Sequence, residues 1–325
     1  MIATAFITPS ANAATAKLKI AHIPKLGTIG YFQAADKGVQ KACKELKATC
    51  AYKGPAEITA AAQTKEINAA VQGGYNVIIV AANDTNALCP ALKAAQKKGV
   101  TVVAYDSDVK GTCRSIFVNQ ASSQGIGDAL ANDAASLAGN SGEIAILSTT
   151  PTATNQNVWI DYMTKNLAAK HPNIKIVATV YGNDKPEDST NETQGLLTKY
   201  PNLKVIVAPT SIGIVAAAKY VDGSASKGKV FVTGLGLPND MKLYVKDGTA
   251  HAALWDVANF GYAAVYAANA IRNGKQSVKL GAKFKSGPTD AGLKTRTVTK
   301  GAVGNELILG PALVFTAANI DKYNF

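Results

Sequence analysis

Residues able to bind a polar small molecule recur at one kind of position in this chain, just after a short apolar run. The run from Val102 to Tyr105, for example, ends in Asp106-Ser107-Asp108. Carboxylate, amide, ammonium and hydroxyl groups can pair with sugar hydroxyls, and aromatic rings can pack on the C–H surface of a sugar. These residue types predict a site for a neutral sugar or small polyol. The candidate site residues are Lys25, Tyr31, Phe32, Asp106, Asn155, Gln156, Trp159, Pro209, Ser211, Trp255 and Asp256.

The apolar runs before these residues alternate with segments of helical periodicity. The spacing predicts strands at 19–23, around Tyr52, at 76–81 and up to Asp106, with helices from 30, at 64–72 and at 87–98 between them. Strands alternating with helices are typical of a doubly wound parallel sheet.

The same pattern then starts again. It predicts strands at 143–148, 175–180, 203–208 and 230–235, separated by helices. We therefore predict an α/β protein of two Rossmann-like doubly wound lobes. The expected boundaries are a tail at 1–16, an N-terminal lobe of 17–118 plus 252–280, and a C-terminal lobe of 119–251 plus 281–325. Three crossings near 118–122, 249–252 and 279–284 would form a hinge.

This organisation gives the candidate residues a common location. Parallel strands present their carboxyl ends at one edge of a sheet, where open α/β sheets bind ligands. The polar and aromatic clusters of both lobes should therefore converge on one cleft between them.

Each candidate also has a purely structural explanation. Asp106 could simply cap a helix or a turn, Asn155 could cap a helix and Lys25 could point into solvent. Trp159 and Trp255 could be core residues. The clustering of the candidates, more than any single residue, argues for a site.

The N-terminal residues resemble the rear part of a signal peptide. A short apolar run is followed by Ala11-Asn12-Ala13, a small-x-small cleavage pattern, although a basic leader is missing. A disordered tail is the alternative. We expect a soluble, exported, periplasmic protein.

Four cysteines fit an oxidising compartment. From their positions relative to the predicted elements we expect the pairs Cys43–Cys50 and Cys89–Cys113. Four buried free thiols are the alternative.

Catalysis is poorly supported by the sequence. The three histidines, His22, His171 and His251, stand apart, and no metal or cofactor motif is present. We expect no enzyme, no cofactor and no metal. Asp106 with a second carboxylate of the cleft is the only glycosidase-like arrangement.

The net charge of +12 is spread along the chain, so we expect no binding to nucleic acid.

Several short motifs occur in an order that resembles a known family. They are I-P-K-L at 23–26, L-C-P-A-L-K at 88–93, D-S-D at 106–108, P-T-A-T-N-Q-N-V-W at 151–159, L-W-D-V at 254–257 and N-I-D-K-Y at 319–323. The chain resembles type I (ribose-like) periplasmic solute-binding proteins of ABC sugar importers. Within them it resembles the branch that holds the L-rhamnose-binding proteins and the autoinducer-2 receptor.

The resemblance implies ligand contacts from Lys25, Asp106, Asn155, Gln156, Pro209 and Ser211. The autoinducer-2 receptor pattern has Asp in place of Asn155 and Ala in place of Ser211, whereas the cysteines Cys89 and Cys113 look like that receptor. The resemblance therefore implies a rhamnose-like deoxysugar or related small polyol as ligand, with autoinducer-2 as the alternative.

Two partners follow from the resemblance. A membrane permease would receive the ligand, and a chemoreceptor could also recognise the loaded protein. A DNA-binding regulator of this fold would need a helix-turn-helix domain in front, for which the residues before the first strand are too few.

Overall fold

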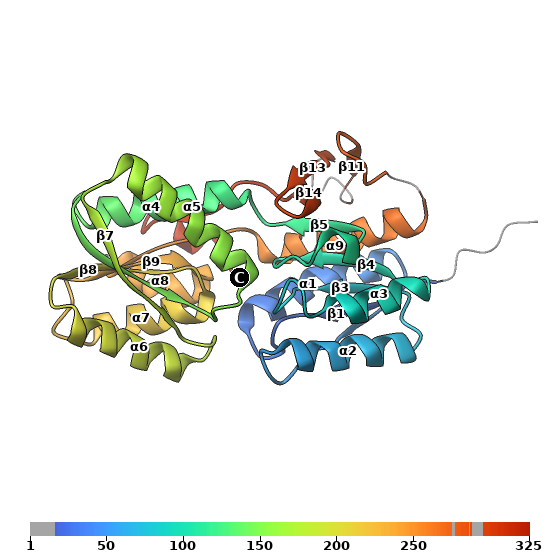
Figure 1. Cartoon of the computed structure of the whole chain (residues 1–325), viewed down its shortest axis with the longest axis horizontal. Coiled ribbons are helices and arrows are strands. Elements are labelled where there is room, and N and C mark those ends of the chain that lie inside the picture. The colour runs from blue at the N-terminus through green and yellow to red at the C-terminus, as the bar shows by residue number, and fades with distance from the viewer. Residues whose placement is uncertain (1–16, 275–276, 286, 288–294) are drawn as a thin grey trace, which may run out of the picture.

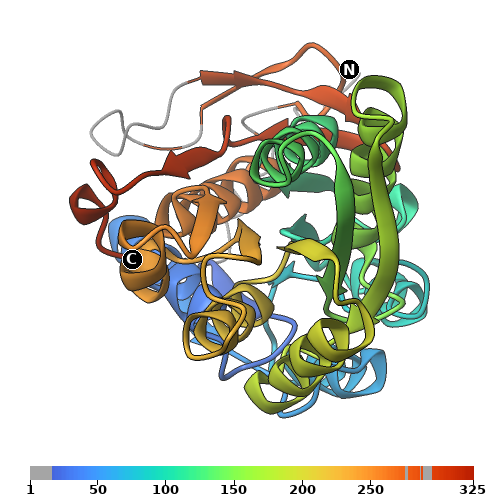
Figure 2. The same ribbon diagram turned by 90° about the vertical axis from the view of Figure 1, so that its left-hand side faces the viewer.

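The chain folds into two α/β lobes that lie side by side (Figure 1). The computed structural model describes residues 17–274, 277–285, 287 and 295–325, and the predicted signal peptide at 1–16 lies outside these residues. Figure 2 views the molecule from the C-terminal lobe and shows helices around the strands. The prediction of two α/β lobes with parallel sheets is confirmed.

The N-terminal lobe is built on one sheet. Its strands are β1 (Lys19–Ile23), β2 (Thr49–Tyr52), β3 (Val77–Val80), β4 (Thr101–Tyr105), β5 (Ile116–Asn119), β13 (Thr299–Gly301) and β14 (Gly304–Ile308). They lie in the order β13-β14-β5-β4-β3-β1-β2, and all neighbours are parallel except β13 and β14. The central strands are covered on both faces, which explains continuous apolar runs such as V-I-I-V in β3. The helices of this lobe are α1 (Gly30–Glu45), α2 (Ala60–Gln72), α3 (Cys89–Lys97) and α9 (Val257–Arg272).

The C-terminal lobe has a second sheet of similar design. Its strands are β6 (Gly142–Ser148), β7 (Ile174–Tyr181), β8 (Leu203–Ala208), β9 (Phe231–Leu235), β10 (Ala250–Leu254) and β15 (Leu313–Phe315). They lie in the order β15-β10-β9-β8-β6-β7, and only β15 is antiparallel to its neighbour. The helices are α4 (Ser123–Leu137), α5 (Thr154–Lys170), α6 (Pro186–Lys199), α7 (Ser211–Asp222) and α8 (Pro238–Lys246). The short strands β11 (Lys283–Lys285) and β12 (Thr295–Thr297) pair with each other.

The predicted assignment of two segments to the lobes is correct for α9 and β15 and wrong for β10, β13 and β14. Residues 252–280 were expected in the N-terminal lobe, but β10 pairs with β9 in the C-terminal sheet, and only α9 packs in the N-terminal lobe. Residues 281–325 were expected in the C-terminal lobe, but β13 and β14 extend the N-terminal sheet beside β5. The cause is pairing between distant segments, which local patterns do not specify. Arg114, for example, donates through Nη1 to the backbone oxygen of Asn305 at 2.7 Å.

The chain crosses between the two sheets three times, at 120–122, 255–256 and 309–312. The first crossing agrees with the predicted position, whereas those expected near 249–252 and 279–284 are elsewhere. The backbone amide of Leu309 donates to the carbonyl of Asn119 at 2.7 Å, so the first and third crossings are joined where they leave the N-terminal sheet. Short segments that connect two domains, such as these crossings, can act as a hinge.

Helices α1 and α9 are in backbone contact. A Cβ atom added at Gly38 would lie 1.7 Å from the carbonyl oxygen of Ala258, and one added at Gly261 would lie 2.1 Å from that of Ala35. Only glycine permits this approach at the two positions. Helix α9, which enters from the C-terminal lobe, therefore completes the packing of the N-terminal lobe.

Two disulfides are present, as predicted. Cys43 at the end of α1 is joined to Cys50 in β2, with Cα atoms 6.3 Å apart. Cys89 at the start of α3 is joined to Cys113 in the short 3-10 helix Gly111–Cys113, with Cα atoms 5.4 Å apart. The second disulfide tethers the loop that follows Asp106 and Asp108.

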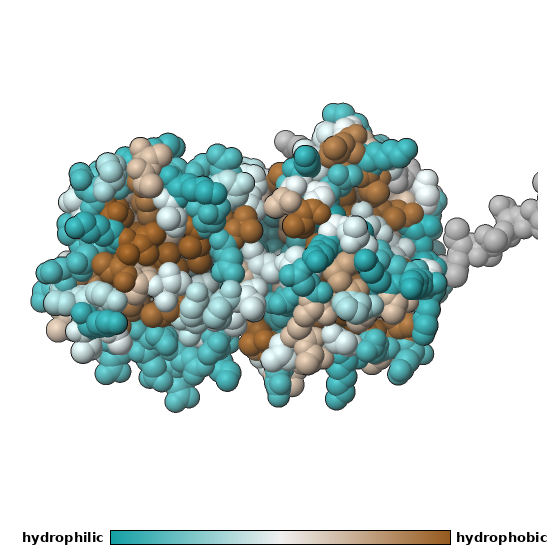
Figure 3. Space-filling model, viewed as in Figure 1, coloured by the Kyte–Doolittle hydropathy of each residue, from teal (hydrophilic) through white to brown (hydrophobic). Residues whose placement is uncertain are grey.

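The surface in Figure 3 is hydrophilic over much of both lobes, with an apolar patch on the left-hand lobe in the region that β7 crosses in Figure 1. This edge strand carries half-buried apolar residues, among them Ile176, Val177 and Val180. Within the described ranges, no helix combines the length and apolar character needed to cross a membrane.

Candidate functional site

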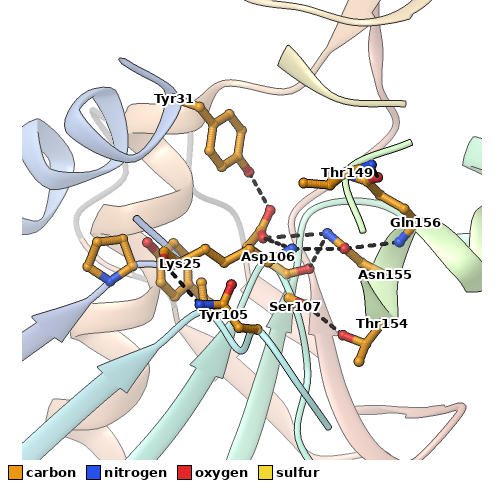
Figure 4. A network of polar contacts seen from close by, with 12 residues as sticks. Lys25, Tyr31, Tyr105, Asp106, Ser107, Thr149, Thr154, Asn155 and Gln156 are labelled. Carbon is orange, nitrogen blue, oxygen red and sulfur yellow. Dashed lines mark hydrogen bonds and ion pairs between the residues drawn. The ribbon is translucent and has the colours of Figure 1, made fainter. Parts of the chain in front are cut away.

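Strand β4 delivers the central carboxylate of the site. Asp106 follows the strand directly and has a left-handed backbone (φ 61°), a conformation that Asp tolerates better than most residues. The Tyr31 hydroxyl donates to its Oδ1 at 2.9 Å, and the Lys25 ammonium lies 3.6 Å from its Oδ2 (Figure 4). All three side chains are buried, so the carboxylate is held in one orientation.

The opposing lobe contributes the first turn of α5. The Asn155 side chain accepts a hydrogen bond from Lys25 Nζ at 3.0 Å and donates to the backbone oxygen and Oδ2 of Asp106, both at 3.4 Å. The carboxamide oxygen of Gln156 accepts from the Ser148 hydroxyl at 2.7 Å and the Thr149 amide at 2.9 Å. Its oxygen is therefore occupied, which leaves the amide nitrogen as the group that can donate to a ligand.

Aromatic rings form one side of the site. Trp255 donates from its indole nitrogen to the Tyr31 hydroxyl at 2.9 Å. Its ring lies edge-on to those of Tyr31 and Trp159, with centroids 6.1 Å away in each case. Phe32 packs edge-on against Tyr31 at 5.0 Å. These rings supply apolar surface beside the polar groups, as the sequence predicted for a sugar site.

The candidate residues line one cavity between the lobes. The space between them, including the part open to solvent, measures about 410 Å³. Ten of the eleven predicted residues contribute to its wall: Lys25, Tyr31, Phe32, Asp106, Asn155, Gln156, Trp159, Pro209, Ser211 and Trp255.

Asp256 is the exception and is withdrawn as a candidate ligand contact. It does not line the cavity but caps α9: its Oδ1 accepts from the Asn259 amide at 2.9 Å and its Oδ2 from the Asn259 side chain at 2.8 Å. A carboxylate at a strand exit and a carboxylate that caps the next helix look the same in a sequence.

Five residues of the cavity wall are not among the predicted candidates: Ile29, Asp184, Thr210, Leu235 and Leu254. Asp184 lies in the loop after β7, where Gly182-Asn183-Asp184 follows a predicted strand in the same way as the other clusters. Its carboxylate accepts a hydrogen bond from the Thr210 hydroxyl. The rule that found the other clusters would have found this one.

Burial governs the electrostatics of the two carboxylates. Desolvation raises the pKa of the Asp106 carboxyl above its usual range, against the opposing effects of the Lys25 charge and the Tyr31 hydrogen bond. Desolvation also raises the pKa of Asp184, and the nearby Asp106 adds to the rise while the Thr210 hydrogen bond and Lys25 oppose it. Poorly solvated carboxylates gain most from hydroxyl donors, which a polyol would supply.

The raised pKa of Asp184 leads to an expected pH dependence of stability. The contribution of the Asp184 carboxyl to the free energy of unfolding is fully present below the pKa that this group has in the unfolded chain, about 4. This contribution is lost as the pH rises through the pKa of the group in the folded protein. The Asp184→Asn variant has no such loss. We expect the free energy of unfolding of the wild type, minus that of the variant, to fall with rising pH in the range above about pH 4. Denaturant titrations across this range measure it, and a flat or rising difference contradicts the assignment.

A further contact joins the lobes outside this cavity. The Ser107 hydroxyl lies 2.6 Å from that of Thr154 (Figure 4), and neither residue lines the cavity. The pair connects the end of β4 to the start of α5. It therefore stabilises the arrangement in which both lobes face the same cavity.

Removing this contact is expected to weaken ligand binding without touching the ligand. Ser107→Ala and Thr154→Val should each lower the affinity about fivefold, the value of one hydrogen bond. The double variant should lose no more than either single one, because both remove the same bond. Calorimetric titration measures this. Thr164→Val is the matched control, since the hydroxyl of this exposed α5 residue donates to the Ile160 carbonyl of its own helix. Additive losses in the double variant would contradict the coupling.

The comparisons with known proteins agree with this geometry. A family model described as "Periplasmic binding protein domain" matches residues 20–276. The chain belongs to the periplasmic binding protein family. The predicted family is thus confirmed, and the protein is a binding protein and not an enzyme.

Solved structures of sugar transporters are similar to this binding protein over nearly the whole chain. An ABC transporter solute-binding protein from Clostridium phytofermentas with bound L-rhamnose is 34% identical (TM-score 0.92; 95% of this chain and 98% of that one covered). A sugar ABC transporter from Actinomyces odontolyticus is 40% identical (TM-score 0.75; 97% and 100%). LsrB from Clostridium saccharobutylicum in complex with AI-2 is 30% identical (TM-score 0.87; 95% and 100%). The chain thus has the fold of sugar-binding solute-binding proteins of ABC transporters.

Proposed function

We propose that this protein binds one small neutral sugar, an L-rhamnose-like deoxysugar or a related small polyol, in the cavity between its lobes. The observation that carries the proposal is the network of Lys25, Asp106 and Asn155, which joins side chains of both lobes at the cavity wall. A ligand that replaces these contacts with its own hydroxyls would bind both lobes at once. Closure of the hinge would then be linked to binding.

The composition of the wall supports a deoxysugar in particular. Asp106 and Asp184 are acceptors for hydroxyl groups, and Lys25 and Gln156 are donors. The apolar side chains of Ile29, Leu235 and Leu254 line the same cavity and offer surface for a methyl group. The structure with bound L-rhamnose is similar over 95% of this chain, which adds support.

Autoinducer-2 is the second candidate. It is favoured by the 30% identity to the protein in complex with AI-2 and by the disulfide Cys89–Cys113, which the sequence shares with that branch. Asn155 and Ser211 argue against autoinducer-2, because the receptor pattern has an anionic Asp in place of Asn155 and an Ala in place of Ser211. An Asn offers one acceptor and a donor where an Asp offers acceptors only.

The proposed cellular role follows from the family. The protein would be exported to the periplasm, release its sugar to the permease of an ABC transporter, and possess no activity on the sugar itself. Presentation of the loaded form to a chemoreceptor is compatible with the same binding step.

Calorimetric titration decides between these ligands. The protein is first unfolded and refolded to remove any bound sugar, and is then titrated with L-rhamnose, other pentoses and deoxyhexoses, and autoinducer-2. We expect binding of L-rhamnose or a close relative and weaker binding of autoinducer-2. The absence of heat with every sugar would overturn the proposed function, and tighter binding of autoinducer-2 would favour the second candidate.

A further inference from the structure

A second chamber adjoins the sugar cavity. It measures about 490 Å³, including the part open to solvent, and is similar in size to the cavity described above. Asp106, Asn155 and Trp159 line both spaces. The two chambers are therefore separated by side chains of the site itself and share a wall.

Both lobes contribute to the second chamber, as they do to the first. The N-terminal lobe supplies Phe117 from β5 and Glu306 from β14, and the C-terminal lobe supplies Ser123 from the start of α4 and Val158 from α5. The turn between β13 and β14 adds Val303 at the rim, with 42% of its surface exposed. A group bound there would contact the same pair of lobes that the sugar contacts.

The lining has the chemistry of a carbohydrate subsite. Phe117 and Trp159 give aromatic surface, and the hydroxyls of Thr85 and Ser123 can donate or accept. Glu306 is buried, and its Oε2 accepts from the Asn119 side chain at 3.0 Å. Among the described residues its second oxygen has no hydrogen-bond donor, so it is free to accept one from a ligand.

Besides Glu306, two carboxylates line the second chamber: Asp106, which both chambers share, and Asp108. Both oxygens of Asp108 accept from Arg114, at 2.6 Å each. The Asp108–Arg114 pair is structural, which leaves Glu306 as the carboxylate acceptor that belongs to this chamber alone.

The amide nitrogen of Asn155 makes the long contacts of the partition between the two chambers, whereas its oxygen accepts from Lys25 at 3.0 Å. Asn155 donates to Asp106 over 3.4 Å in both of its contacts, the long end of the range for such bonds. A ligand hydroxyl that takes over these contacts would join the two spaces.

We propose that the second chamber is a subsite for a substituent on the bound sugar, so that the substrate class includes glycosides and disaccharides of that sugar. This inference rests on the proposed function, because the first chamber must hold the sugar ring. The substituent is then an aglycone or a second ring, packed on Phe117 and Trp159 and hydrogen-bonded to Glu306.

The test compares L-rhamnose with phenyl α-L-rhamnoside and a rhamnosyl-rhamnose disaccharide by calorimetric titration. The wild type is expected to bind the glycosides within about tenfold of the free sugar. Val303→Trp, at the rim, should fill the chamber and weaken glycoside binding by about tenfold or more, with L-rhamnose changed by less than about twofold. Val314→Trp is the matched control, because Val314 is also an exposed valine of the C-terminal segment and lines neither chamber.

Each outcome has one meaning. If L-rhamnose binds and the glycosides do not, the inference is overturned and the proposed function stands. If Val303→Trp weakens both ligands equally, or Val314→Trp has the same effect on the glycosides, the inference is also overturned. If neither L-rhamnose nor its glycosides bind, the proposed sugar fails and the inference fails with it. Melting temperatures verify folding, and Ala302→Phe on the same exposed turn replaces Val303→Trp if that variant does not fold.

Discussion

Asp106→Asn is expected to weaken sugar binding by about 30- to 1000-fold, or roughly 2–4 kcal/mol. The Asp106 carboxylate is buried and oriented by Tyr31 and Lys25, and in the proposed complex it accepts hydrogen bonds from sugar hydroxyls. An amide in its place has one acceptor atom fewer and leaves Lys25 without its neighbouring charge. Asn tolerates the left-handed backbone at this position, so the variant tests the carboxylate and not the fold. Calorimetric titration with the sugar that binds the wild type measures the loss.

Asp256→Asn provides the control. Asp256 also follows a strand next to the hinge, but its carboxylate caps α9, and Asn caps helices as well as Asp does. The affinity of the Asp256→Asn variant for the sugar should equal that of the wild type. Normal binding by Asp106→Asn, or an equal loss in Asp256→Asn, would show that the site is assigned to the wrong residues.

Gly38→Ala is expected to lower the free energy of unfolding by about 3 kcal/mol or more. The new methyl carbon would lie 1.7 Å from the carbonyl oxygen of Ala258, so α1 and α9 would have to move apart along their contact. Overpacking of this kind costs about 1–3 kcal/mol where side chains can adjust, and here the obstacle is backbone. Denaturant unfolding followed by circular dichroism measures the change.

Gly195→Ala is the control for the helix propensity of alanine. Gly195 lies in α6, and a Cβ atom there would meet nothing within 4 Å. This variant should be more stable than the wild type by about 0.5–1 kcal/mol. Similar stabilities of the Gly38 and Gly195 variants would contradict the close contact between α1 and α9.

The sequence predicted most elements because their signals are local. The strands Lys19–Ile23 and Leu203–Ala208 occur at the predicted residues, where apolar runs end at turn-forming residues. Helix α2 begins four residues before the predicted start because Thr59 caps it, through a hydrogen bond from the Ala62 amide. Helix α8 was missed altogether. Its Pro238 occupies the first turn, where proline is favourable, although the same residue also suggests a loop.

The pairing of strands that are distant in the sequence could not be predicted from local patterns. Strand β14 joins the N-terminal sheet through β5, which lies far earlier in the chain, and a short strand carries no information on which edge it will extend.

The candidate site was easier to predict, because the parallel sheets bring the carboxyl ends of the strands together. Asp256 marks the limit of that rule. Whether a polar residue after a strand faces the cavity or caps a helix depends on backbone angles that the sequence pattern leaves open.

The interlaced path of the chain has a consequence for biosynthesis. Helix α9 and strand β14 complete the N-terminal lobe, yet they are translated after the sheet strands β6 to β10 of the C-terminal lobe. While the nascent polypeptide grows, α1 has no partner for the side that carries Gly38, and β5 remains an open edge. The N-terminal lobe is thus the first to begin folding and the last to be completed. Until α9 and β14 are synthesised, the nascent chain exposes apolar surface and an unpaired strand edge, which chaperones can bind.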